Sequence, residues 1–167
     1  MKNLVFINGT MGVGKTTTSK FLLKLLPDCI FLDGDWCWYA DPFVVNDETK
    51  RMVKDNMGYL LNNFLLNSAY NNILFCWVMD EDSIINEILS LIKIQNYKLY
   101  KFSLVCSKNA LASRIKNDVE NGVRSVSVLE RALLRQQNYM QMDTIKIDVS
   151  DNTPEDAAHI MLRYISK

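Results

Sequence analysis

Short apolar runs alternate along the chain with longer stretches in which apolar residues recur every three or four positions. The short runs predict strands, bounded by glycine, asparagine and aspartate. Five strands are expected, at Leu4–Ile7, Cys29–Leu32, Ile73–Met79, Leu99–Cys106 and Thr144–Val149. Ile73–Met79 is the most apolar of them and too short for a helix that is hydrophobic on all sides. It therefore fits a central strand that is covered on both faces.

The longer stretches predict helices. Six are expected: Lys15–Leu26, a long helix within Asn46–Tyr70, Ile84–Ile92, Ser107–Lys116, Val128–Met142 and Thr153–Ile165. Asp80 and Ser107 are candidate N-caps, Ser127 and Glu130 match a capping box, and Thr153 precedes a proline suited to a first helical position. Strands that alternate with helices predict right-handed crossovers and a parallel sheet. The predicted fold class is α/β, a three-layer α/β/α domain with a five-stranded parallel sheet.

Composition fits one folded domain over residues 1–167. Hydrophobic residues make up 49% and charged residues 23% of the chain, and no repeat or linker interrupts it. The 19 basic and 19 acidic residues cancel, so no global field favours nucleic acid or an anionic membrane. The longest apolar run is too short to cross a bilayer, and the start of the chain lacks the features of a signal peptide.

The cysteines do not form a metal or disulfide pattern. The four are widely spaced without a C-x-x-C pair, and the chain has one histidine. This pattern does not predict a zinc site, and dispersed thiols favour a cytoplasmic protein with buried or inert cysteines.

The segment from Gly9 to Thr16 matches the phosphate-binding pattern G-x-x-x-x-G-K-[ST], directly after a predicted strand and before a predicted helix. Its glycines let successive backbone N–H groups point into one concavity, and the helix N-terminus adds partial positive charge. Lys15 is expected to bind the β- and γ-phosphates and Thr16 to hold Mg²⁺. The predicted nucleotide-binding residues are Gly9, Met11, Gly12, Val13, Gly14, Lys15, Thr16 and Thr17. The chain lacks the N-K-x-D element of GTPases, and the expected cofactors are ATP and Mg²⁺.

Two carboxylates, Asp33 and Asp35, follow the second predicted strand, at the sheet edge where the phosphate loop also lies. In phosphoryl transfer, one carboxylate can orient the acceptor hydroxyl and take its proton. A second can hold waters on Mg²⁺. Because Asp-Gly is a common turn dipeptide, a structural turn is the alternative interpretation.

The phosphate loop and the string Leu32-Asp33-Gly34-Asp35 resemble the first 40 residues of the small P-loop kinases. This group includes adenylylsulfate kinase, gluconate kinase, chloramphenicol phosphotransferase and the kinase half of polynucleotide kinase. The resemblance implies a nucleoside-kinase-like P-loop NTPase domain, with Asp35 contacting the acceptor hydroxyl and Asp33 beside it. A weaker match at Leu104–Arg114 implies a mobile lid near residues 115–127. Arg114 and Arg124 would then offset charge on the transferred phosphoryl group, with a solvated helix face as the alternative for Arg114.

The acceptor-binding region is expected near residues 36–70. Aromatic residues cluster just after the acidic pair, and they either wall the acceptor pocket or pack under the long helix. They are Trp36, Trp38, Tyr39 and Phe43. Adenylylsulfate and polynucleotide kinases carry an arginine where this chain has Trp36, Cys37 and Trp38, so an anionic acceptor is less supported. Asp80 either orders the hydration shell of Mg²⁺ or caps a helix, and residues 151–153 are candidates for adenine contacts.

These features favour an ATP- and Mg²⁺-dependent kinase that phosphorylates a hydroxyl of a small-molecule acceptor. Its catalytic candidates are Lys15, Asp33, Asp35, Arg114 and Arg124. One alternative is a regulatory ATP-binding module without turnover. Another is a nucleic-acid end kinase, which the neutral charge balance does not favour. The sequence predicts neither a membrane partner nor an oligomeric state.

Overall fold

The computed structural model describes residues 1–123, 125 and 127–166. Its centre is a five-stranded sheet in the order β2-β3-β1-β4-β5, in which every neighbouring pair is parallel. The strands are β1 (Lys2–Gly9), β2 (Cys29–Asp33), β3 (Asn72–Cys76), β4 (Tyr97–Val105) and β5 (Ile145–Asp148). The predicted α/β class and five-stranded parallel sheet are therefore confirmed.

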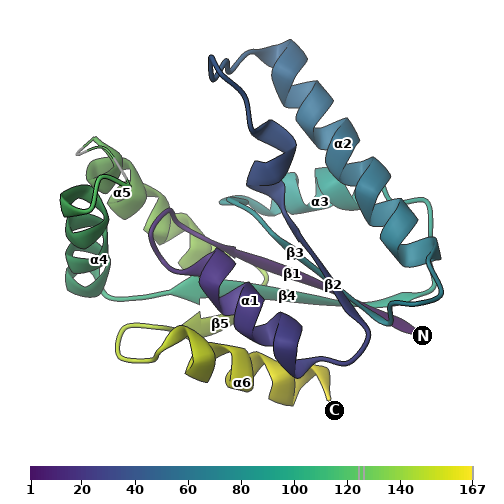
Figure 1. Ribbon diagram of the computed structural model, residues 1–167. Coiled ribbons are helices and arrows are strands. Elements are labelled where there is room, and N and C mark those ends of the chain that lie inside the picture. The colour runs from purple at the N-terminus through teal and green to yellow at the C-terminus, as the bar shows by residue number, and fades with distance from the viewer. Residues whose placement is uncertain (124, 126, 167) are drawn as a thin grey trace.

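Helices connect the strands and cover both faces of the sheet (Figure 1). They are α1 (Lys15–Leu25), the 3₁₀ helix η1 (Gly34–Trp38), α2 (Asp47–Leu66), α3 (Asp82–Ser90), α4 (Lys108–Glu120), α5 (Val128–Gln141) and α6 (Pro154–Ile165). All six predicted helices are present. η1 is the additional element, and it begins at the Asp-Gly dipeptide that the turn interpretation concerned.

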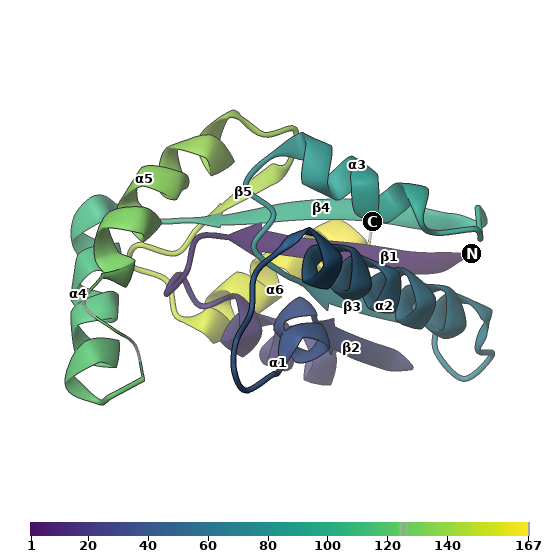
Figure 2. The same ribbon diagram turned by 90° about the horizontal axis from the view of Figure 1, so that it is seen from above.

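The core has two parts because successive side chains of a strand point to opposite faces. On β1, Val5 and Ile7 belong to the cluster formed with α1 and α6. Leu4 and Phe6 belong to the cluster formed with α2 and α3 on the other face. Figure 2 shows α2 and α3 on one side of the sheet and α1 and α6 on the other. Because both faces are covered, β1 is buried from Leu4 to Gly9, and the phosphate loop follows directly from it.

Four capping predictions have different outcomes. The Ser107 side chain accepts a hydrogen bond from the Ala110 N–H, and Thr153 forms a capping box with Asp156 ahead of α6. Ser127, by contrast, has helical backbone angles and makes no side-chain cap. Its hydroxyl instead lies 2.9 Å from that of Ser125, so the predicted capping box with Glu130 is wrong. Asp80 is not a cap either, because α3 begins at Asp82 with Glu81 in the N-cap position.

The strand predicted to continue to Met79 ends at Cys76. The last β3 residue, Cys76, pairs with Asp33 of β2. Directly after Asp33 the backbone turns into η1, so no further residues of β2 can form hydrogen bonds with the segment after Cys76. The difference matters for the site, because residues 77–80 leave the sheet at its ligand-binding edge. Within the described part of the chain, no helix has both the length and the apolar character that a bilayer crossing requires.

Leu61 of α2 tests the second half of the core. This side chain is fully buried, so Leu61→Ala should lower the free energy of unfolding by about 2–5 kcal/mol through lost contacts and a cavity. Leu134→Ala is the matched control, because that leucine is 72% exposed on α5 and should change stability by less than about 0.5 kcal/mol. Urea unfolding followed by circular dichroism measures both. Equal losses in the two variants would contradict the assigned core.

Candidate active site

The phosphate loop curls at the carboxyl end of β1 through three glycines with positive φ. These are Gly9 at 145°, Gly12 at 80° and Gly14 at 104°. Side chains would also have no room at two of these positions. A Cβ on Gly9 would lie 2.8 Å from the Leu104 carbonyl oxygen, and one on Gly12 would lie 2.7 Å from the Ile115 side chain. The glycines are thus needed both for the backbone conformation and for close packing against β4 and α4.

Hydrogen bonds from distant segments hold this loop in place. The buried Thr10 hydroxyl donates to the Ala132 carbonyl of α5 at 2.8 Å. Arg114 of α4 donates to the Val13 carbonyl at 3.2 Å. The Lys15 ammonium lies over the loop and donates to the carbonyls of Gly9 at 2.9 Å and Thr10 at 3.1 Å. The loop, its lysine and the first turn of α1 therefore form one fixed anion-binding concavity.

Asp33 joins the end of β2 to the start of α1. Its side chain is 5% exposed, and each of its oxygens accepts a hydrogen bond. One accepts from the Thr16 hydroxyl at 2.6 Å, and the other accepts from the Asp35 N–H at 3.1 Å and so caps η1. The carboxylate predicted beside the metal thus contacts the predicted metal ligand Thr16 directly. It also sets the direction in which the chain continues to Asp35.

One pocket of about 430 Å³ contains most of the predicted site. Its lining residues include Lys15, Thr16 and Thr17 of α1, Asp35 of η1 and Arg114 of α4. Met11, Gly12, Val13 and Gly14 also line it, whereas Gly9 forms the turn behind them. Asp33 lies at the edge of the pocket through its contact with Thr16. Arg124 falls outside the described residues.

The structure gives Arg114 a specific position. Its guanidinium donates to the carbonyls of Val13 in the phosphate loop and Val149 after β5, in addition to lining the pocket. A purely solvated helix face does not describe this side chain. Val149, Asn152 and Pro154 line the same pocket, and of these only Asn152 belongs to the segment 151–153 where adenine contacts are predicted.

Arg135 of α5 is a charged neighbour of the site that the sequence analysis missed. Its guanidinium lies 3.4 Å from the carboxylate of Asp80, which follows β3. The pair joins α5 to the carboxyl edge of the sheet, so Asp80 has a cation as its partner rather than a helix N-terminus. No local sequence signal reveals it, because the two residues meet only when α5 packs across the sheet.

The aromatic cluster after Asp35 divides between several surroundings. Trp36 packs edge-on against Phe31 at 5.3 Å between ring centroids. Trp38 lies 5.3 Å from Phe43 and donates to the Val44 carbonyl, while Tyr39 is 98% exposed. None of these rings lines the nucleotide pocket. Of these four aromatic residues, only Trp38 joins the core cluster under α2, so packing under the long helix does not describe the whole group.

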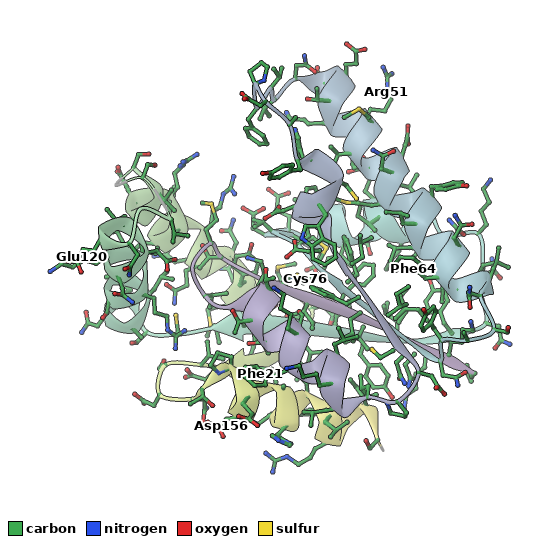
Figure 3. All side chains as sticks on the ribbon, in the orientation of Figure 1. Phe21, Arg51, Phe64, Cys76, Glu120 and Asp156 are labelled. Atoms are coloured by element: carbon green, nitrogen blue, oxygen red, sulfur yellow. The ribbon has the colours of Figure 1, made fainter. Side chains whose placement is uncertain are left out.

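Cys76 is buried near the middle of the molecule, beside Asp33 in the neighbouring strand (Figure 3). Burial raises the pKa of its thiol to about 12, and the negative charge of Asp33 adds to this effect. The same two causes raise the pKa of the half-buried Cys37. The four cysteines are free thiols. Within the described ranges, no three histidine, cysteine or acidic side chains form a metal-binding group.

A family described as an AAA domain matches residues 5–134, which include the phosphate loop, the acidic pair and the start of α5. The chain belongs to this family. No curated protein sequence matches the chain significantly.

Solved structures extend the likeness over nearly the whole fold. The tunicamycin resistance protein of Deinococcus radiodurans is 15% identical with a TM-score of 0.70, covering 99% of this chain and 96% of that one. A gluconokinase from Sinorhizobium meliloti is 15% identical with a TM-score of 0.67, covering 98% and 93%. The Mycobacterium tuberculosis APS kinase, solved with AMPPNP and APS, is 9% identical with a TM-score of 0.66, covering 99% and 98%. At these identities the likeness shows that the fold of this AAA-domain chain is that of the P-loop kinases.

Cysteine labelling tests the surroundings of the acidic pair. The thiolate is the species that reacts with iodoacetamide, so a raised pKa and burial both slow the reaction at pH 8. Cys37 should be labelled first in the native protein, and the fully buried Cys76 at least roughly tenfold more slowly. Peptide mass spectrometry over time measures both. Cys37→Ser should remove the early label, and equal labelling of the two thiols would show that Cys76 is accessible.

Proposed function

We propose that the protein is an ATP- and Mg²⁺-dependent kinase that transfers the γ-phosphate to a hydroxyl group of a small-molecule acceptor. The observation that carries the proposal is one pocket lined both by the anion-binding loop with Lys15 and Thr16 and by the carboxylate residue Asp35. An anion site and an acid that share a cavity are the minimum that phosphoryl transfer to an alcohol requires. Family membership and the P-loop kinase fold support the same reaction class.

The proposed phosphate-binding part of the site consists of groups that lie together around the glycine-rich loop. Backbone N–H groups of the loop, the N-terminus of α1 and the Lys15 ammonium would bind the β- and γ-phosphates. The Lys15 ammonium donates hydrogen bonds to the backbone carbonyls of Gly9 and Thr10, at 2.9 and 3.1 Å. Phosphate oxygens carry full charge and accept stronger hydrogen bonds than carbonyls, so the ammonium would turn toward the nucleotide.

The Mg²⁺ site would be formed by Thr16 and Asp33. Their oxygens lie 2.6 Å apart at the mouth of the loop, and oxygen ligands of this kind suit a hard divalent cation. The protein alone supplies few ligands, which matches an ion completed by phosphate oxygens and water. When bound, Mg²⁺ neutralises the charge that develops on the β- and γ-phosphates.

Asp35 would act on the acceptor. Its backbone N–H is held by Asp33, and it lines the pocket beside the phosphate loop. As the acceptor oxygen forms its bond to the γ-phosphorus, the bond from that phosphorus to the bridging oxygen breaks and ADP leaves. The proton of the acceptor hydroxyl passes to the Asp35 carboxylate or to solvent.

The proposed lid comprises residues 115–127 of this single domain. Its two ends adjoin segments anchored to the phosphate loop, since Arg114 contacts Val13 and Ala132 accepts from Thr10. Closure between these anchors would exclude water and limit ATP hydrolysis. Arg114 would lie at the nucleotide, and Arg124 is retained as the candidate cation of the moving segment.

Asp35→Asn is the decisive variant. Loss of the base should lower kcat about 10²- to 10⁴-fold while ATP affinity stays unchanged, because Asp35 is proposed to act on the acceptor rather than on the nucleotide. Transfer of labelled phosphate would be measured across a panel of nucleosides, sugars and antibiotics, and ATP binding by calorimetry. Asp55→Asn makes the same chemical change at an exposed position of α2 and should behave as the wild type. An Asp35→Asn enzyme with full activity would remove the proposed role.

Lys15→Met tests the phosphate end. Removing one charge-assisted interaction should weaken ATP binding roughly 10- to 100-fold. Lys20→Met is the control, because Lys20 lies on the same helix but is exposed and outside the pocket. Calorimetric titration with ATP and Mg²⁺ compares the two. Unchanged affinity in Lys15→Met would mean that the nucleotide binds elsewhere.

A further inference from the structure

A second groove lies between the edge strand β2 and α2, away from the nucleotide pocket. It has a volume of about 480 Å³. It is lined by Phe31, Leu32, Trp36, Cys37, Asn56, Tyr59, Leu60 and Phe64. The two cavities share no lining residue, and none of the residues of this groove is charged. Most of this groove falls within the region near residues 36–70 where acceptor binding is expected, but it shares no lining residue with the pocket that contains Asp35.

The exposed face of α2 extends the groove. Asn63 and Leu66 follow Tyr59 at intervals of four and seven residues, so they lie on the same side of the helix. Trp36 is 56%, Tyr59 70% and Leu66 66% exposed. We call the groove together with Asn63 and Leu66 the α2–β2 patch. The Trp36 and Tyr59 side chains together leave roughly 200–300 Å² in solvent, a substantial part of the ~800 Å² that each partner of a standard interface buries.

The absence of charge extends beyond the groove. The chain has no charged residue from Asn56 to Met79, although several side chains in this segment are exposed on α2 and the turn after it. In Figure 3, Phe64 lies on the C-terminal half of α2, whereas the charged Arg51 lies near the opposite end of the helix. Charged groups lie only at the two ends of the patch. Asp55 is exposed four residues before Tyr59, and the Lys2 ammonium donates to the carbonyls of Phe64 and Asn67. The side chains that form the patch itself are uncharged, although charged residues normally make up much of a protein surface.

We infer that the α2–β2 patch is the contact surface between two copies of this chain related by a twofold axis. A twofold contact places the same patch on both sides, so any charge in it would face a like charge. An uncharged patch avoids this repulsion. Asparagine side chains and the tyrosine hydroxyl both donate and accept hydrogen bonds, so identical groups can also pair with each other across the axis. A partner of opposite charge would instead select a charged surface.

The position of the patch in the fold fits this contact. β2 is an edge strand that pairs only with β3, and a second copy would cover the groove beside its open edge. η1 carries both Trp36 of the patch and Asp35 of the nucleotide pocket. A second copy seated on the patch would therefore rest against the short helix that presents Asp35, the proposed catalytic base.

Sedimentation velocity over a range of protein concentrations tests the inference. The wild type should associate to a dimer at micromolar concentrations. Tyr59→Lys should weaken this association at least roughly tenfold, because it places two positive charges in the contact. Met140→Lys is the matched control, since Met140 is a 60% exposed apolar residue on α5, outside the patch, and should associate like the wild type.

Two results would overturn the inference. One is a wild-type protein that stays monomeric at every concentration, which would assign the patch to a different partner. The other is a dimer that survives Tyr59→Lys, which would show that the copies meet elsewhere. Circular dichroism and ATP titration of all three proteins check that the fold and the nucleotide site are intact. The dimer and the kinase reaction are measured separately. A protein that dimerises through the patch but transfers no phosphate would contradict the proposed function and would still support the inferred contact.

Discussion

The backbone conformation between β1 and α1 is the constraint on which the site depends. Six residues must reverse the chain so that their N–H groups face one point, and the positive φ angles of Gly9, Gly12 and Gly14 allow it. Local sequence alone does not hold that shape. The loop is tied by Thr10 to α5 and by Arg114 to α4, residues more than a hundred positions away. Elements that look peripheral in the ribbon are thus part of the anion site.

Asp33 extends the same constraint to the second strand. Because both of its oxygens accept hydrogen bonds, one carboxylate fixes the first turn of α1 and the first turn of η1 together. Gly34 allows the start of η1 to pack closely against Trp77, since a Cβ at this position would lie 2.6 Å from the Trp77 ring. The Leu-Asp-Gly-Asp string therefore combines a buried connector, a residue of minimal size and an exposed acid. Under the proposed function, only the last of these meets the acceptor.

Local patterns in the sequence predicted most of the fold and the position of the glycine-rich loop between β1 and α1. Five apolar runs gave the five strands, and the glycine pattern identified the loop, because both depend on neighbours in the chain. The errors involve distant partners. Ser127 matches a capping box but bonds to Ser125, and Asp80 matches an N-cap but pairs with Arg135. The strand after Ile73 ends early because β2 stops pairing with it, which its own composition does not reveal.

Main-chain groups and side chains have different parts in the proposed site, and this difference bears on the choice of acceptor. Under the proposed function, phosphate binding relies mostly on main-chain groups, which do not depend on the identity of the side chains. Under the proposed function, acceptor choice rests on the side chains near Asp35. The segment from Asp35 to Asn46 contains two aspartates and no lysine or arginine. Arg135, a cation near the carboxyl edge, is paired with Asp80. Under the proposed function, an uncharged or cationic alcohol therefore suits the segment after Asp35 better than a phosphorylated or sulfated one, because that segment itself offers an anion no cationic partner in exchange for lost hydration.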